Sequence, residues 1–250
     1  MKYFAAFSIF LLLSCSDSEE IENKLSEIIV EKAIEYSGKQ KLNSHELEFD
    51  FRDYHYKSVP NCNGFTLSRI QHESKVKDVL KNGKLTRYRN DSIVELADST
   101  AFKYKESLNS VHYFMQLPLR LQDQAVNKKY IGKDTIENKI YYKIQITFDE
   151  KDGGEDFQDV FQYWFENETF SMDYLAYSFM TNGGGLRFRK AINPREIDGV
   201  KFQDYENYKP KSDTAKLSEL SKHYKNDELE LLSKIENENI QLKPKKLDCE

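Results

Sequence analysis

His112 is the residue of this sequence best suited to acid–base chemistry, because an imidazole changes its charge close to neutral pH. It lies in a segment of helical periodicity, and Arg120 and Asp123 follow it as candidate partners. A histidine on a helix more often forms a hydrogen bond with a neighbouring sheet than takes part in catalysis. We therefore expect His112 to contribute to a binding site without acting as a catalyst.

Arg187 and Arg189 alternate with apolar residues in a predicted strand, so their side chains project from one face. Guanidinium groups in this arrangement can bind a carboxylate or a phosphate head group. The alternative, which we favour from the sequence, is a cross-strand ion pair with Asp173 or Glu166.

The common signatures of enzymes and of cofactor binding do not occur in this sequence. It has no nucleotide loop, no Gly-x-Ser-x-Gly elbow and no metalloprotease histidine pair. The acidic segment 149–159 offers carboxylate oxygens for Ca²⁺, but it lacks the order of an EF-hand loop, and we interpret it as a solvated turn. We therefore expect neither an enzyme nor a bound cofactor or metal ion.

The N-terminus carries a targeting signal. The apolar stretch from Tyr3 to Leu13 is about half the length that a transmembrane helix needs, which indicates a signal peptide over residues 1–14. The last residues of this stretch, with Ser14 and Cys15, resemble a bacterial lipobox, so Cys15 is the expected lipid attachment site and residues 15–20 an acidic tether. We expect an outer-membrane lipoprotein of the cell envelope, held by its acyl chains and facing the periplasm or the cell surface.

Two cysteines remain after lipidation, Cys62 in a turn-like segment and Cys249 near the C-terminus. Export places them in an oxidising compartment, where they can pair. Free thiols are the alternative, and the sequence leaves the choice open.

A short pattern of Asp, then Ser or Thr, then an aliphatic residue or Thr resembles a periplasmic O-glycosylation signal. Turns and helix caps also select Asp-Ser and Asp-Thr pairs, which explains part of the pattern. The candidate sites are Ser92, Ser99, Thr135 and Thr214.

The elements that would position these residues follow from periodicity. Apolar residues at helical spacing predict an N-terminal helix over 18–37, which Gly38 is suited to end, and an inserted helix from about 98 to 116. Period-two alternation predicts antiparallel strands elsewhere, and segments 160–165 and 170–179 are apolar on both faces, as in strands that are covered twice. Residues 229–242 predict a closing strand.

These elements describe an α+β fold with a large curved antiparallel sheet, a half-barrel of about 10 to 12 strands. The N-terminal and inserted helices should pack on its concave face. We expect one domain over residues 21–242 and a loose C-terminal tail over 243–250.

A hollow between this sheet and its helices is where a ligand would bind. The residues that we expect to contact it are Phe49, Phe51, Phe65, His112, Phe114, Trp164, Tyr174, Arg187 and Arg189. Val160 and Trp164 should face away from Phe161, Tyr163 and Phe165.

The net charge makes nucleic acid an improbable partner. Lys and Arg number 37 against 42 Asp and Glu, which gives a formal charge of −5. Proteins that bind DNA or RNA usually carry an excess of basic residues for the phosphates.

Segments 109–118, 172–177, 187–191 and 204–208 resemble an uncharacterised family of Bacteroidetes-type lipoproteins, for which no activity is implied. The layout of a leading helix, a curved sheet and an inserted helix ending in Leu-Pro is similar to the lipoprotein-localisation (Lol) carriers. That resemblance implies a half-barrel and helical lid around an acyl-binding cavity. The leading hypothesis is a lipoprotein that binds an apolar or amphipathic ligand; the alternatives are a structural or interaction module without a ligand and an enzyme with an unrecognised site.

Overall fold

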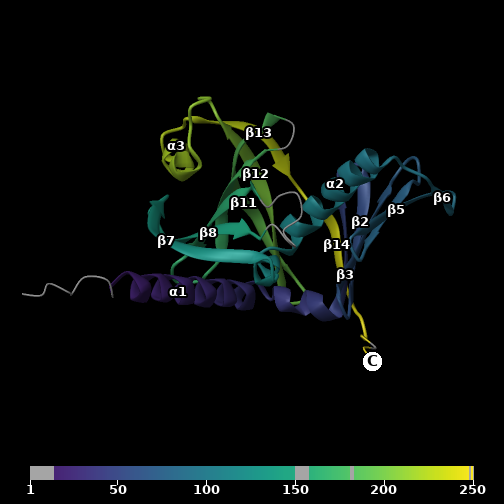
Figure 1. The fold of residues 1–250 in the computed structure, drawn as a ribbon, viewed down its shortest axis with the longest axis horizontal. Helices are drawn as coiled ribbons and strands as arrows, with labels where there is room; N and C mark the ends of the chain where they lie inside the picture. The colour runs from purple at the N-terminus through teal and green to yellow at the C-terminus, as the bar shows by residue number, and fades with distance from the viewer. Residues whose placement is uncertain (1–13, 150–157, 181–182, 248, 250) are drawn as a thin grey trace, which may run out of the picture.

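The computed structural model describes residues 14–149, 158–180, 183–247 and 249. In this part of the chain the strands form two antiparallel sheets of seven strands each (Figure 1). The first sheet has the order β14 (Glu238–Pro244), β1 (His45–Phe51), β2 (Tyr54–Asn61), β3 (Gly64–Gln71), β4 (Lys77–Lys81), β5 (Lys84–Arg89) and β6 (Ser92–Val94). The second has the order β13 (Leu229–Ile235), β12 (Val200–Pro210), β11 (Gly185–Ile197), β10 (Met172–Phe179), β9 (Val160–Glu166), β8 (Lys139–Phe148) and β7 (Val126–Ile136).

The two sheets meet where the chain passes from β13 to β14, each of which is the edge strand of its own sheet. Asp204 of β12 fixes this corner, because its Oδ1 accepts hydrogen bonds from the Asn237 backbone N–H at 3.0 Å and from Arg195 Nη2 at 2.9 Å. Arg195 Nη2 also donates to the Asn237 carbonyl at 2.6 Å. The predicted α+β class with a large curved antiparallel sheet is confirmed. The strands are more numerous than we expected, and the segment interpreted as one closing strand is two, because the chain turns there from one sheet into the other.

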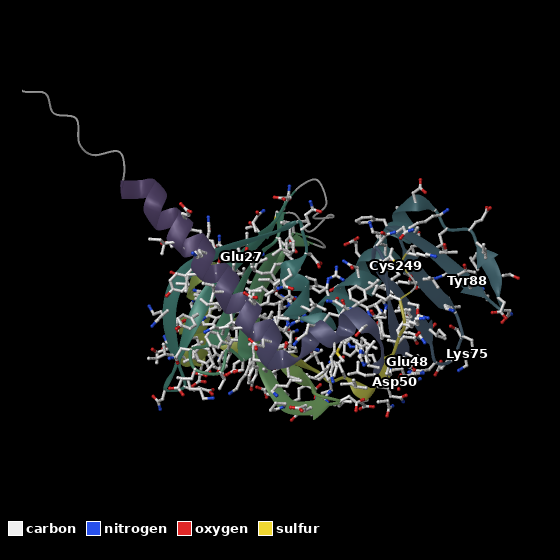
Figure 2. All side chains as sticks on the ribbon, turned by 90° about the horizontal axis from the view of Figure 1, so that it is seen from below. Glu27, Glu48, Asp50, Lys75, Tyr88 and Cys249 are labelled. Atoms are coloured by element: carbon white, nitrogen blue, oxygen red, sulfur yellow. A yellow bond between two sulfur atoms is a disulfide. The ribbon has the colours of Figure 1, made fainter. Side chains whose placement is uncertain are left out.

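Helix α1 (Ser14–Ser37) lies against one face of the second sheet, here called the inner face (Figure 2). It buries Ile29, Val30 and Ala33, and its Glu27 pairs with Lys128 of β7 at 3.1 Å. Gly38 ends the helix, as predicted, with a φ of 65°. A side chain at this position would collide with the Gly199 carbonyl oxygen, so the close approach of α1 to the β11–β12 turn requires a glycine. The short helix η1 (Lys39–Ser44) then leads into β1.

Helix α2 (Asp98–Gln116) packs on strands β3, β4 and β5 of the first sheet, and its bounds agree with the prediction. A buried ion cluster fastens it there: Asp78 accepts hydrogen bonds from Arg69 at 2.9 Å and from Arg87 at 2.7 Å. Arg69 also donates to Ser107 of α2, and the Arg87 guanidinium lies 3.6 Å from the Tyr104 ring centroid. The cations satisfy the buried carboxylate and join three strands to the helix. After α2, η2 (Leu119–Gln122) leads toward β7.

Strand β9 separates two cores. Phe161, Tyr163 and Phe165 belong to the inner core, which the two long helices cover. Trp164 belongs to an outer core on the other face of the sheet, where it meets Phe188 under α3 (Leu220–Lys225), a helix that η5 (Leu217–Glu219) precedes. The expected alternation of this strand and its coverage on both faces are therefore confirmed.

The C-terminal tail, which we expected to be loose from residue 243, is instead held by the first sheet. Strand β14 continues to Pro244, and the Lys245 N–H donates to the Ser44 carbonyl at 2.8 Å. Cys249 forms a disulfide with Cys62, with a Cα–Cα distance of 5.7 Å, so the pairing that the sequence left open is present. Among the described residues, none of the helices is long and apolar enough to cross a membrane.

Candidate functional site

A groove of about 720 Å³ runs between α2 and the inner face of the second sheet. Seven of its eighteen lining residues are aromatic. Alternation in β9 and β10 turns Phe161 and Tyr177 to the same face, and the strand register sets them directly opposite each other. Their rings stack with centroids 5.1 Å apart. The other aromatic side chains that line the groove are Phe102, Tyr113, Phe114, Phe148 and Phe179.

Charged side chains lie along the same groove. Arg120 pairs with Asp123 at 2.6 Å, just beyond the end of α2. Arg187 lies over the Phe179 ring at 4.9 Å, and its Nη1 donates to the Leu186 carbonyl at 2.8 Å. The groove thus combines an apolar lining with charged groups, as expected for a site that receives an amphipathic molecule.

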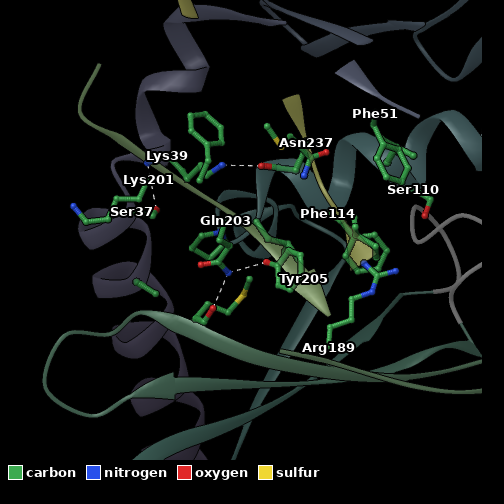
Figure 3. Close-up of a pocket in the computed structure, with 18 of the residues that line it drawn as sticks. Ser37, Lys39, Phe51, Ser110, Phe114, Arg189, Lys201, Gln203, Tyr205 and Asn237 are labelled. Atoms are coloured by element: carbon green, nitrogen blue, oxygen red, sulfur yellow. Dashed lines mark hydrogen bonds between the residues drawn. The ribbon is translucent and has the colours of Figure 1, made fainter. Parts of the chain in front are cut away.

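A second, smaller cavity of about 120 Å³, here called the inner cavity, adjoins the groove (Figure 3). Ser110 and Phe114 of α2 line both spaces. The inner cavity is enclosed by the end of α1, the C-terminal half of α2, strands β10 to β12 and the corner between the sheets. Its principal polar residues are Ser37, Lys39, Arg189, Lys201, Gln203 and Asn237.

Arg189 extends from β11 into the inner cavity and lies over the Phe114 ring at 3.9 Å (Figure 3). It is only 8 % exposed; its Nη2 donates to the Tyr177 hydroxyl at 2.9 Å, and its Nε has no hydrogen-bond partner among the described residues. None of the described carboxylates pairs with it, so the predicted ion pair with Asp173 or Glu166 is wrong. A bulge in β10 next to Asp173 interrupts the alternation, and Asp173 accepts a hydrogen bond from Tyr141 of the outer core. Glu166 accepts instead from the Thr169 backbone and hydroxyl at the turn after β9.

Lys39 is the second buried basic residue of the inner cavity and is only 3 % exposed. Its Nζ donates to the Met115 carbonyl at 2.7 Å and lies 3.8 Å from the Phe202 ring centroid. Burial and then the positive charge of Arg195 hold the pKa of Lys39 well below its ordinary value. Gln203 lies near it and donates to both the Met172 carbonyl and the Tyr205 hydroxyl at 2.8 Å.

The structure brings together only some of the residues that the sequence nominated for ligand contact. Phe51, Phe114 and Arg189 line the inner cavity, and Phe114 and Arg187 line the groove. The other nominated residues line neither of these spaces: Phe49 and His112 are buried in the inner core, Phe65 lies beside Arg120, and Trp164 and Tyr174 are in the outer core.

His112 connects α2 to the first sheet. It is fully buried between the rings of Phe49 and Tyr56, and its Nε2 lies 3.2 Å from the Ser68 carbonyl. Burial lowers the pKa of His112 to about 4, so the ring is neutral at physiological pH and Nε2 donates to the carbonyl. Its suggested partners, Arg120 and Asp123, pair with each other instead. The sequence-based preference for a bond to a sheet residue over catalysis therefore agrees with the geometry.

Sequence reasoning missed Lys39, Gln203 and Tyr205. Lys39 directly follows the helix-ending Gly38, a position that usually faces solvent, and no local pattern distinguishes it from the other lysines. Tyr205 alternates correctly for a buried face, but the sequence does not reveal which buried face lines a cavity. The described residues hold no group of three or more potential metal ligands, and Glu150 to Asp156 of the acidic segment lie outside them.

The sequence of the chain matches the model of one protein family. The model of a family of unknown function, DUF6503, matches residues 1–237. The chain belongs to this family. A search of curated proteins found no match.

Solved structures with the same fold share little sequence with this DUF6503 protein. A LolA superfamily protein from Nitrosomonas europaea has a TM-score of 0.51 and 11% identity, over 87% of this chain and 93% of that chain. A DUF1329 family protein from Desulfovibrio piger has a TM-score of 0.50 and 10% identity, over 86% of this chain and 92% of that chain. These likenesses concern the fold, and they confirm the Lol-like layout that the sequence suggested.

Proposed function

We propose that this DUF6503 protein is a lipid-binding protein of the cell envelope, which holds the apolar part of an amphipathic ligand in the groove between α2 and the second sheet. The groove is the main observation that supports this proposal. Its volume of about 720 Å³ lies within the range of about 300 to 1,000 Å³ of small-molecule sites, and seven of its eighteen lining residues are aromatic. A structural module whose interior is completely filled would not leave such a space, because protein interiors pack nearly as densely as organic crystals.

Lipidation and placement at the outer membrane belong to the same proposal. The lipobox supports attachment of acyl chains at Cys15, which lies in the first turn of α1; residues 1–13, which cover nearly all of the proposed signal peptide, lie outside the described residues. The likeness to a LolA superfamily protein supports a role with lipid, since that superfamily's fold is the one found here. An envelope lipoprotein would meet acyl chains at the membrane to which it is anchored.

The part of the chain that the structure describes shows no catalytic arrangement to support the enzyme alternative. His112 is the strongest acid–base candidate, and it is fully buried and lines neither cavity. We therefore propose binding without chemical conversion of the ligand.

Calorimetric titration of the soluble domain with hexadecanoic acid tests the proposal. Saturable binding with a negative heat-capacity change is expected, because an acyl chain would leave water for the aromatic groove. Ser110→Trp should weaken this binding at least about tenfold, since Ser110 lies at the surface of α2 and lines the groove. Ser99→Trp is the matched control, because it places the same side chain at an exposed position of α2 away from both cavities.

Lipid extraction of the domain purified from its own host, followed by mass spectrometry, gives an independent measurement. We expect a lipid to be recovered in a stoichiometric amount. If no lipid is recovered and fatty acids, phospholipids, isoprenoids and sterol-like compounds all fail to bind, the structural module replaces the proposed function.

A further inference from the structure

We propose that the inner cavity binds the anionic head group of the ligand, a carboxylate or a phosphate, between Arg189 and Lys39. This inference rests on the proposed function, since it places the acyl chain of the same molecule in the groove. It adds a ligand class: acidic lipids in preference to neutral ones of the same chain length.

Arg189 provides the first argument. A guanidinium group keeps its charge at all physiological pH values, and a buried charge is normally paired with an opposite one. Arg189 is more than nine-tenths buried, yet it contacts the Tyr177 hydroxyl and the faces of the Phe114 and Tyr177 rings, and its Nε donor is unused among the described residues. An anion in the inner cavity would supply both the missing charge and the missing acceptor.

The surroundings of Lys39 provide the second argument. Lys39 donates to a backbone carbonyl and forms no ion pair with a described carboxylate. The described carboxylates near this part of the fold have other partners: Asp204 pairs with Arg195 at 2.9 Å, Glu196 pairs with Lys201 at 2.9 Å, and Asp173 accepts a hydrogen bond from Tyr141. Two buried basic residues therefore line one small cavity, and no carboxylate in the described part of the chain pairs with either of them.

Neutral donors and the size of the cavity fit an oxyanion as well. The Tyr205 hydroxyl accepts a hydrogen bond from Gln203 Nε2, which leaves its own proton available. Burial raises the pKa of Tyr205 to about 12, so the hydroxyl keeps this proton at neutral pH. The volume of about 120 Å³ is close to the roughly 150 Å³ of an apolar cavity that accepts benzene, and a carboxylate or phosphate is no larger than that.

Arg189 also lies where the two spaces meet. It stacks on Phe114, which lines both of them, and donates to Tyr177, which lines the groove. A head group beside Arg189 would therefore leave its chain directed along the aromatic wall of the groove.

The test compares three ligands with the same sixteen-carbon chain: hexadecanoic acid, hexadecyl phosphate and hexadecan-1-ol. We expect each anionic ligand to bind at least about tenfold more tightly than the alcohol, which is the usual effect of a charge-assisted hydrogen bond. The tighter of the two anions then identifies the head group as carboxylate or phosphate. Equal affinities for all three would overturn this inference and leave the proposed function standing, whereas failure of all three to bind would overturn both.

Variants test whether the preference for anionic ligands depends on the inner cavity. Arg189→Met should abolish most of the preference for the anions while changing the affinity for the alcohol less than about threefold, and Arg189→Lys should restore part of it. Lys39→Met should reduce the preference as well, because methionine keeps the packing on Phe202 without the charge. Arg89→Met is the matched control, because Arg89 is exposed and lines neither the groove nor the inner cavity, and the preference should remain. If Arg187→Met abolishes the preference and a folded Arg189→Met keeps it, the head group does not lie in the inner cavity.

Discussion

Replacement of His112 by phenylalanine should make the stability of the protein less sensitive to acid. The folded protein keeps this fully buried imidazole neutral, because burial lowers the pKa of His112 to about 4. In the unfolded chain the same group has an ordinary pKa of about 6.5 and becomes protonated as the pH falls. The contribution of His112 is therefore fully present above about pH 6.5, and the folded protein loses stability between pH 6.5 and 4.

The size of this loss follows from the two pKa values. Each pH unit in this range costs about 1.4 kcal/mol for one proton, so the free energy of unfolding should fall by about 2 kcal/mol between pH 7 and pH 5 through His112 alone. His112→Phe keeps an aromatic ring against Phe49 and Tyr56 but loses the hydrogen bond to Ser68, which should cost about 1 to 2 kcal/mol at pH 7. The variant should then approach or exceed the stability of the wild type at pH 5.

Urea unfolding of both proteins at pH 7, 6 and 5 measures the difference directly. Other titrating groups affect the two proteins alike, so the difference in unfolding free energy isolates His112. A difference that stays constant to within about 0.5 kcal/mol over this range would refute the argument that the folded protein buries a neutral imidazole, and with it the structural role of His112 between α2 and β3.

Four further outcomes are expected. Loss of the Cys62–Cys249 disulfide, as in the double serine variant, should lower the free energy of unfolding by about 2 to 5 kcal/mol, since the bond closes a loop with a sequence separation of 187 residues; an equal urea midpoint for the variant and the oxidised wild type would contradict this. The fluorescence emission of Trp164, which lies in the outer core, should not change when hexadecanoic acid binds. A tryptophan at the groove-lining position 161, introduced as Phe161→Trp in a Trp164→Phe background, should change its emission. The opposite result would place the ligand on the outer face of the sheet. Cys15→Ala should release the protein from membranes, and its retention after a high-salt wash would show a different anchor. Glycans are expected on four exposed hydroxyl residues, Ser92, Ser99, Thr135 and Thr214. The mass of the protein purified from its own host should therefore exceed that of the lipid plus the polypeptide, and alanine substitution of all four residues should remove the excess. An unmodified native mass would contradict the glycosylation hypothesis.

Local periodicity was sufficient for the elements whose surroundings are simple. The spacing of apolar residues defined α2, because one stripe of a helix must be buried against a sheet whichever strands supply the surface. In the same way, Phe161 and Trp164 could be assigned to opposite faces of β9, since successive side chains of a strand alternate.

The same patterns left open which of the two buried faces encloses a cavity. Trp164 and Phe161 are both large, aromatic and buried, yet only Phe161 lines the groove. Apolar residues in a filled core and in a ligand site have the same periodicity, because both are removed from water. The nominated aromatic residues were therefore divided: Phe51 and Phe114 line a cavity, whereas the others line neither the groove nor the inner cavity, namely Phe49, Phe65, Trp164 and Tyr174.

What the sequence by itself determined about this protein is the class of fold, the end of α1 at Gly38, the limits of α2, the lipobox and the pattern of buried strand faces, all of which depend on neighbours along the chain. The start of α1 was predicted at residue 18, but the helix begins at Ser14. The tertiary structure alone decided that the segment before the tail turns at Asn237 to join two sheets, that Cys62 meets Cys249, and that Lys39 and Arg189 line one cavity. The two basic residues are far apart in the sequence and come together only because η1 and β11 lie on opposite sides of the inner cavity. That arrangement arises from the path of the chain in space, and no local spacing of residues encodes it.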